Sequence, residues 1–245
     1  MKKNKILKKT PKAKKKKKSR VSFILRFLLL IFLSSVALSL FYALLCKWVN
    51  PPITITQAGS FVRGYGLKRN YVPLSQISRD MKLAVIASED QLFADHNGFD
   101  FVSIKKAMKH NQKSKSMHGA STISQQVAKN VFLWQHGGFV RKGLEVYFTF
   151  LIENIWTKKR ILEVYLNVIE TGKGVFGVDA AAKYYFNKKA VSLTRTEAAM
   201  IAACLPNPGT HTIHPLSQPV ATRYPWILNQ MNNLEGDPDI KELLN

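Results

Sequence analysis

Two glutamates in this chain occupy positions where a carboxylate is unusual. The apolar run Ala84–Ala87 leads almost directly into Glu89, and Glu145 lies in a largely apolar segment one helical turn after Arg141. Burial disfavours the charged form of a carboxylate and raises its pKa, which suits a general base or a general acid. The sequence therefore predicts acid–base chemistry at Glu89 and Glu145.

A third segment, residues 119–130, adds groups that suit a sugar phosphate. On a helix, one face would carry the polar side chains of Thr122, Gln126, Lys129 and Asn130. Hydroxyl and amide groups bind neutral sugars, whereas Lys129 and Arg141 could meet phosphate. A helix start at Ser121 would also present backbone N–H groups to an anion. Together, the three segments predict a site for sugar-phosphate chemistry.

Two of these segments also have purely structural interpretations. Asp90, Phe93 and His96 could simply close a helix end around a satisfied histidine. Arg141 and Glu145 could form a surface ion pair worth about 0.3–0.5 kcal/mol. The residue types alone leave both interpretations open.

Helical periodicity predicts the elements that must position these side chains. Thr194 and Glu197 form a capping box before one such helix, and Pro206 ends it. A β-leaning stretch at 53–56 predicts one short strand. The predicted helices span residues 81–88, 101–110, 121–132, 141–156, 158–168, 198–205 and 225–234. The expected fold is therefore a mainly helical domain over residues 80–245, large enough for its own core.

The net charge of +22 is concentrated at the amino terminus. Residues 1–20 hold twelve Lys or Arg and no acid, and residues 51–245 keep only +8. Such a basic block cannot bury itself, which predicts a disordered tail. The twenty uncharged residues that follow, 27–46, would rise about 30 Å as a helix and cross a bilayer. We therefore predict a basic tail (1–20), a transmembrane helix (21–48) and a connector (49–79).

The apolar segment could instead be a cleaved signal peptide. Its length exceeds the usual apolar core of about 7–15 residues, and no small-residue cleavage site follows it. The positive-inside bias places the amino terminus in the cytoplasm and residues 49–245 outside. The tail then acts as a topology signal that contacts anionic lipid, and nucleic-acid binding by the tail alone remains the alternative.

Five segments, in order, resemble the motifs of the peptidoglycan glycosyltransferase family. They are Glu89-Asp-x-x-Phe-x-x-His-x-Gly-x-Asp100, Gly119-Ala-Ser-Thr-Ile-Ser-Gln-Gln-x-x-Lys-Asn130, Arg141-Lys-x-x-Glu145, Lys158-x-x-Ile-Leu-Glu-x-Tyr-Leu-Asn167 and Leu193-Thr-x-x-Glu-Ala-Ala-x-x-Ala-Ala-x-Leu-Pro-Asn-Pro208. Only 37 residues follow the last motif, which predicts a monofunctional member without a transpeptidase domain. Residues 172–177 depart from the family pattern, because Val175 and Phe176 stand where many members have Ala-Tyr.

The resemblance implies an all-α, lysozyme-like fold with a cleft between two lobes. It also implies polymerisation of lipid II at the bacterial inner membrane, with the catalytic domain in the periplasm. In the family reaction, the 4-hydroxyl of an incoming lipid II attacks the anomeric carbon of the growing, lipid-linked glycan. A β-1,4 bond forms with inversion, and undecaprenyl pyrophosphate leaves.

The resemblance also assigns roles to individual residues. Glu89 matches the general base, and Glu145 matches the second essential glutamate on the donor side. The expected substrate-binding residues are Asp90, Phe93, His96, Ser121, Thr122, Gln126, Lys129, Asn130 and Arg141. No cofactor is expected, although a divalent cation could bridge pyrophosphate oxygens. Cell-wall synthesis proteins are expected partners, and nucleic acid is not.

Two other functions fit part of the pattern. A membrane-bound muramidase would cut the same polymer with a single glutamate, but it would not need the phosphate-binding pair Lys129 and Arg141. An inactive membrane scaffold would not need the intact set of charged residues.

Overall fold

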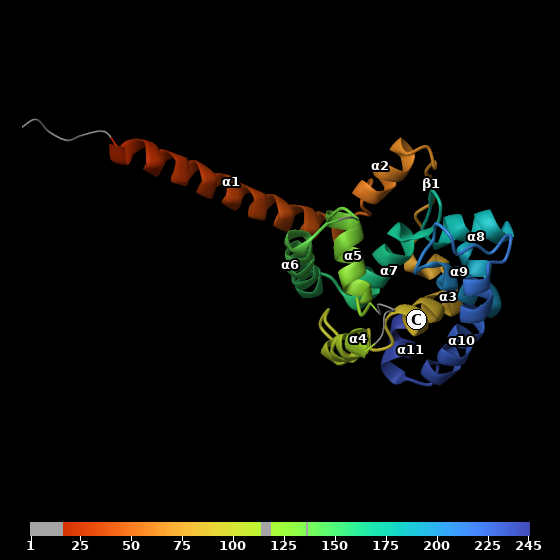
Figure 1. The fold of residues 1–245 in the computed structure, drawn as a ribbon. Coiled ribbons are helices and arrows are strands. Elements are labelled where there is room, and N and C mark those ends of the chain that lie inside the picture. Colours follow the sequence, from red (N-terminus) through yellow and green to blue (C-terminus); the bar gives the residue numbers. More distant parts are fainter. Residues whose placement is uncertain (1–16, 114–118, 136) are drawn as a thin grey trace, which may run out of the picture. The chain divides into compact units, whose positions relative to one another are not determined.

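The computed structural model describes residues 17–113, 119–135 and 137–245, which form two units, up to Tyr42 and from Ala43 to Asn245. The first unit is most of helix α1 (Lys17–Cys46), whose stretch Ser22–Cys46 is long and apolar enough to cross a membrane (Figure 1). Residues 17–20 are thus helical, contrary to the predicted disorder, because lysine and arginine readily extend a helix already begun. The rest of the basic tail, residues 1–16, lies outside the described residues.

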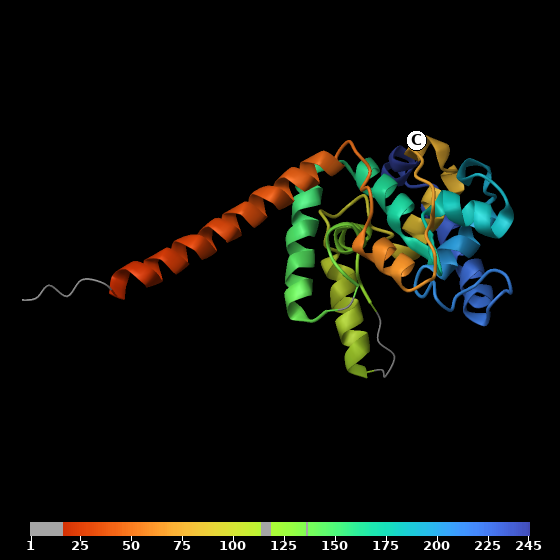
Figure 2. The ribbon, with the colours of Figure 1, turned by 90° about the horizontal axis from the view of Figure 1, so that it is seen from above.

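The second unit is mainly helical, as predicted, and its helices pack in two groups (Figures 1 and 2). One group contains α3 (Arg79–Glu89), α9 (Arg195–Cys204), α10 (Gln218–Leu234) and α11 (Pro238–Leu244). The other contains α5 (Ile123–Phe132), α6 (Phe139–Ile155) and α7 (Lys158–Val168). The remaining helices of this unit are α2 (Ile55–Val62), α4 (Phe101–Lys113) and α8 (Val178–Phe186).

Six of the seven predicted helices are confirmed nearly within their expected bounds. The seventh, α10, begins at Gln218 and carries Pro225 in its interior, whereas the prediction started at that proline. The prediction missed α2, α8 and α11. Helix α8 begins after Gly177 and ends at Phe186, and the next residue, Asn187, adopts the left-handed conformation that often closes a helix.

The strand predicted at residues 53–56 is wrong. Thr54 caps α2 there, because its hydroxyl accepts the N–H of Gln57 and the Gln57 side chain returns to the Thr54 N–H. These local hydrogen bonds outweigh the β-propensity of the stretch. The actual sheet consists of β1 (Lys68–Arg69), β2 (Glu170–Gly172) and β3 (Val175–Phe176), in the order β1-β3-β2.

The core holds the carboxyl-terminal end of α3 in place. Every residue of α3 from Met81 to Ala87 is buried, and Glu89 is the last residue of the helix. Tyr165 and Leu166 of α7 are fully buried as well. The burial of α3 fixes where its terminal glutamate emerges.

Candidate active site

Glu89 lies where the two helix groups meet. Its side chain is only 13% exposed, and the amide Nε2 of Gln126 on α5 donates to its Oε2 at 3.0 Å. The Oε1 of the same amide accepts the hydroxyl of Tyr165 on α7 at 3.1 Å. This chain of hydrogen bonds fixes the amide orientation of Gln126 and directs a donor at the carboxylate.

The electrostatic surroundings of Glu89 favour a proton acceptor. Burial raises the pKa of Glu89, and the hydrogen bond from Gln126 and the charge of Arg223 oppose that rise only in part. The guanidinium of Arg223 on α10 lies 3.5 Å from Oε1. Oε1 itself accepts no hydrogen bond from any described residue. One oxygen of a destabilised carboxylate is therefore left for an incoming proton.

A cleft of about 1080 Å³ opens beside Glu89. The predicted residues that line it are Glu89, Asp90, Ser121, Thr122 and Gln126. Arg223 and Pro206 contribute from the other helix group, and Asp100 and Lys106 contribute from the region of α4. Lys129, Arg141 and Glu145 are not part of this lining, so the predicted site divides into two regions.

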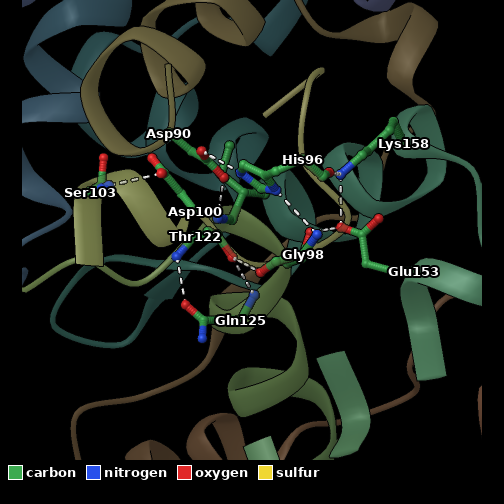
Figure 3. Close-up of polar contacts among 11 residues, drawn as sticks. Asp90, His96, Gly98, Asp100, Ser103, Thr122, Gln125, Glu153 and Lys158 are labelled. Carbon is green, nitrogen blue, oxygen red and sulfur yellow. Dashed lines mark hydrogen bonds and ion pairs between the residues drawn. The ribbon is translucent and has the colours of Figure 1, made fainter. Parts of the chain in front are cut away.

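Asp90 and His96 connect the loop that follows α3 with the start of α5 (Figure 3). One carboxylate oxygen of Asp90 lies 2.9 Å from His96 Nε2, and the other accepts the backbone N–H of Ile123 at 2.9 Å. Because the N–H of Gly98 donates to His96 Nδ1, the Nε2 atom carries the proton that faces Asp90. These contacts are the ones that the purely structural interpretation of the segment expects, and the substrate-binding role of Asp90 and His96 stays a prediction.

Thr122 fastens the same loop to the start of α5 (Figure 3). It caps the helix, and its hydroxyl donates to the carbonyl of Gly98 at 2.7 Å. Gly98 has φ +88°, and a Cβ there would lie 2.8 Å from Cγ2 of Thr149. Only glycine adopts this positive φ readily and leaves the space that Thr149 occupies, which explains Gly98 in this segment. Thr122 therefore precedes the helix, rather than standing on its polar face as predicted.

Glu145 occupies a second, cationic region on α6. Its carboxylate is 4% exposed and pairs with Arg141 at 2.8 Å and with Lys142. Lys129 on α5 completes the group, and burial lowers its pKa although the charge of Glu145 works in the opposite direction. The Lys129 ammonium forms no hydrogen bond or ion pair with the residues that the structure describes. This region thus offers positive charge rather than a free carboxylate.

Two of the predicted substrate-binding residues, Phe93 and Asn130, are buried in the interior. The Phe93 ring is completely buried, and the Lys158 ammonium lies 4.7 Å from its centroid. Asn130 is buried too, and its Oδ1 accepts the Gln135 amide at 2.7 Å. Both residues line the interior behind the site.

Sequence reasoning missed Arg223 and Glu153. Arg223 belongs to the stretch after the fifth motif, and no local pattern marked it. Glu153 pairs with Lys158 at 2.8 Å, and the Lys158 ammonium also donates to the carbonyl of His96 (Figure 3). Lys158, which opens the fourth motif, could have pointed to Glu153, because a largely buried cation requires an anionic partner.

Comparisons with known proteins identify relatives of this chain. A family model described as Transglycosylase matches residues 56–232. A biosynthetic peptidoglycan transglycosylase of Aeromonas hydrophila is 54% identical over 168 residues, covering 69% of this chain and 72% of the relative. Proteins of the same name from Shewanella oneidensis (48% over 193 residues, 79% and 78% covered) and Bacteroides thetaiotaomicron (47% over 220 residues, 89% of each) are also similar.

Proposed function

The chain belongs to the transglycosylase family, and from that premise we propose how its residues perform the reaction. The protein is a peptidoglycan glycosyltransferase that polymerises glycan chains in cell-wall synthesis. We assign to it the joining of lipid II units by inverting β-1,4 transfer, with undecaprenyl pyrophosphate as the leaving group.

Glu89 is the proposed general base. The incoming sugar hydroxyl gives its proton to Oε1, the oxygen that accepts no hydrogen bond within the described chain. Gln126 holds the other oxygen, so the free one stays oriented as the hydroxyl attacks. The raised pKa makes the carboxylate a stronger base than an exposed glutamate, and general-base catalysis typically contributes about 10²–10⁴ in rate.

The cationic region is the proposed donor side. Lys129 and Arg141 would bind the pyrophosphate, and Glu145 holds Arg141 and Lys142 in position before the donor arrives. A pyrophosphate is already a good leaving group, so fixed positive charge helps more than protonation would. An inverting displacement needs a base on one side and charge stabilisation on the other, and the two regions supply one each.

The remaining predicted residues are proposed to act around these two regions. Asp90, His96 and Phe93 position Glu89 from behind, and Thr122 holds the loop that carries them. Ser121 lines the cleft, where its hydroxyl could meet a sugar. Asn130 supports α5 from the interior.

A divalent cation would enter with the substrate. Among the residues described, no group of three or more His, Cys, Asp or Glu could hold a metal. Both oxygens of Glu145 are already paired, so the donor side offers cations instead of metal ligands. We propose that a divalent ion would act on the donor side by neutralising charge on the pyrophosphate, which Lys129 and Arg141 would bind.

The apolar helix fits a single-pass membrane anchor. We propose that it lies in the bacterial inner membrane with the basic amino terminus in the cytoplasm and the catalytic unit in the periplasm. The predicted divisions at residues 20, 48 and 79 stay part of this proposal, and the family match already begins at residue 56. The ligands are then lipid II and the lipid-linked glycan, with cell-wall synthesis proteins as partners and no nucleic acid.

The observation that carries the proposal is the buried Glu89 carboxylate in the lining of the cleft, one oxygen of which accepts no hydrogen bond from a described residue. The test incubates the full-length protein in detergent with labelled lipid II and follows chain growth. Lengthening chains are expected from the wild type and from a Glu242→Gln control, whose glutamate is exposed. Shortening of preformed glycan without any growth would instead identify a muramidase, and an inert wild type would identify a scaffold.

A further inference from the structure

A second pocket lies apart from the Glu89 cleft and is strongly basic. Its volume is about 900 Å³, and none of its lining residues lines the cleft. Five basic residues and one acidic residue form its charged lining, namely Lys68, Arg69, Asp179, Lys183, Lys188 and Lys189. The proposed mechanism uses none of them.

Four of these cations have no anionic partner among the described residues, although Arg69 is held by the Pro52 carbonyl and the Gln57 side-chain oxygen. Asp179 is engaged by the Asn70 amide and the Ala190 N–H, each at 2.8 Å, and Glu197 pairs with Lys188 at 2.7 Å. Lys68, Lys183 and Lys189 form no ion pair within the described ranges. The Lys183 ammonium donates to the side-chain oxygen of Asn187, a neutral group, so the positive charge of all three lysines is left uncompensated for a ligand.

The helix dipole explains only part of this cluster. Lysines near the carboxyl-terminal end of α8, such as Lys183, are favoured there by the partial negative charge of the helix. Lys68 comes from β1, far away in sequence, and reaches the pocket because β1 pairs with β3. Its ammonium lies 4.2 Å from the centroid of the Tyr184 ring. Two separate segments thus bring cations to one pocket, and Lys68 lies against its aromatic ring.

The other groups in the pocket suit a sugar. Tyr184 is 53% exposed as a residue, and Asn70 and Asn187 line the same pocket. An exposed aromatic ring packs against the apolar face of a sugar, amides bind its hydroxyl groups, and ammonium groups bind carboxylates. This combination is typical of a site for an acidic carbohydrate.

The pocket does not adjoin the place where the second unit continues from the apolar helix. Trp156, directly after α6, donates to the carbonyl of Ala43, and Arg160 donates to those of Cys46 and Val49, where the chain leaves the apolar helix. Helices α6 and α8 lie at opposite ends of the second unit in both views (Figures 1 and 2). The pocket is therefore at the other end of this unit from its first residues, Ala43 to Val49.

We propose that this basic pocket binds a carboxylate-bearing glycan strand, the class of polymer that the enzyme makes. The identity of the strand rests on the proposed function, whereas the preference for an acidic glycan rests on the pocket itself. The pocket would hold finished strand outside the cleft, with sugar rings on Tyr184 and peptide carboxylates at Lys68, Lys183 and Lys189.

The test measures binding of soluble, uncross-linked glycan strands to the full-length protein in detergent. The strands carry their peptides but no lipid pyrophosphate, which limits binding at the donor side. Lys183→Glu/Lys189→Glu should weaken binding about tenfold, because two attractive charges become repulsive. A control with equal charge change at exposed positions, Lys159→Glu/Lys241→Glu, should bind like the wild type. Strands stripped of their peptides should bind weakly to all three proteins.

Polymerisation of lipid II in the same preparations separates this proposal from the proposed function. Both double variants should retain wild-type initial rates, which also shows that they are folded. Unchanged strand binding by Lys183→Glu/Lys189→Glu would overturn the pocket proposal, as would pocket-dependent binding to phosphatidylglycerol vesicles instead of strands. A wild type that binds strands but never polymerises lipid II would overturn the proposed function alone.

Discussion

Glu89 and Glu145 are both buried carboxylates, yet their surroundings are opposite. Glu145 is held by Arg141 and Lys142, so its charge is compensated on both oxygens. Glu89 has one hydrogen bond from Gln126 and a more distant Arg223, and burial raises its pKa. A compensated carboxylate organises other charges, whereas a poorly compensated one can take a proton. The comparison assigns positioning to Glu145 and base chemistry to Glu89.

The largest expected effect comes from Glu89→Gln. It removes the base without changing the size of the side chain, so the rate of lipid II polymerisation should fall by about 10²–10⁴. Chain growth on labelled lipid II measures this loss. Near-normal activity of the variant would contradict the assignment of Glu89 as the base.

The same variant should be more stable than the wild type. Burial of the charged carboxylate is unfavourable, and its removal should add about 0.5–2 kcal/mol to the free energy of unfolding near neutral pH. Because the folded-state pKa is raised, the gain should disappear below pH 4.5, where folded and unfolded chains both hold the protonated acid. Thermal unfolding in detergent across this pH range measures it, and a loss of stability at pH 7 would contradict the electrostatic argument.

Glu145→Gln should have the opposite effect on stability. It leaves Arg141 and Lys142 without their partner beside Lys129, and breaking a buried ion pair typically costs about 3–5 kcal/mol. Because the Lys142 side chain is 48% exposed and water can solvate its charge, we expect a loss near the lower end of this range, about 3 kcal/mol. Thermal unfolding under the conditions used for Glu89→Gln provides the matched measurement. Equal shifts of the same sign would remove the distinction between the two glutamates.

The pH profile of polymerisation should reflect one group from each region. Activity should rise with pH as Glu89 ionises. The midpoint of this rise should lie above the ordinary glutamate pKa of 4.5, because burial raises the pKa of Glu89. Activity should fall again as Lys129 loses its proton. The midpoint of this fall should lie below the ordinary lysine pKa of 10.5, because burial lowers the pKa of Lys129. Initial rates at lipid II concentrations well below saturation report the pKa values of the free enzyme and test both limbs. Lys129→Met should abolish the alkaline limb along with most activity.

The smallest expected effect is that of Gln126→Leu. The hydrogen bond from Gln126 lowers the pKa of Glu89, so its loss should move the acidic limb to higher pH. The plateau rate should change less than in Glu89→Gln because the carboxylate remains. An acidic limb that stays in place would show that Gln126 does not tune Glu89.

The catalytic motifs could be recognised from sequence because each lies on or beside one element. The capping box at Thr194 and the periodicity of α5 are local properties, and both elements form as predicted. The strand at 53–56 was mispredicted because propensity and capping compete within the same residues. Arg223 could not be found, because its importance depends only on the helix against which α10 packs.

By itself, the sequence determined the membrane-length apolar helix, the order of the motifs, the mainly helical fold and the two candidate glutamates. These follow from composition and short-range spacing, which neighbouring residues fix. Only the tertiary structure decided which glutamate is compensated, that Thr122 and Asp90 join two segments, and that Lys68 meets Tyr184. Those properties depend on burial and on contacts between distant segments, and both the pKa of a carboxylate and the availability of a cation are set by such contacts.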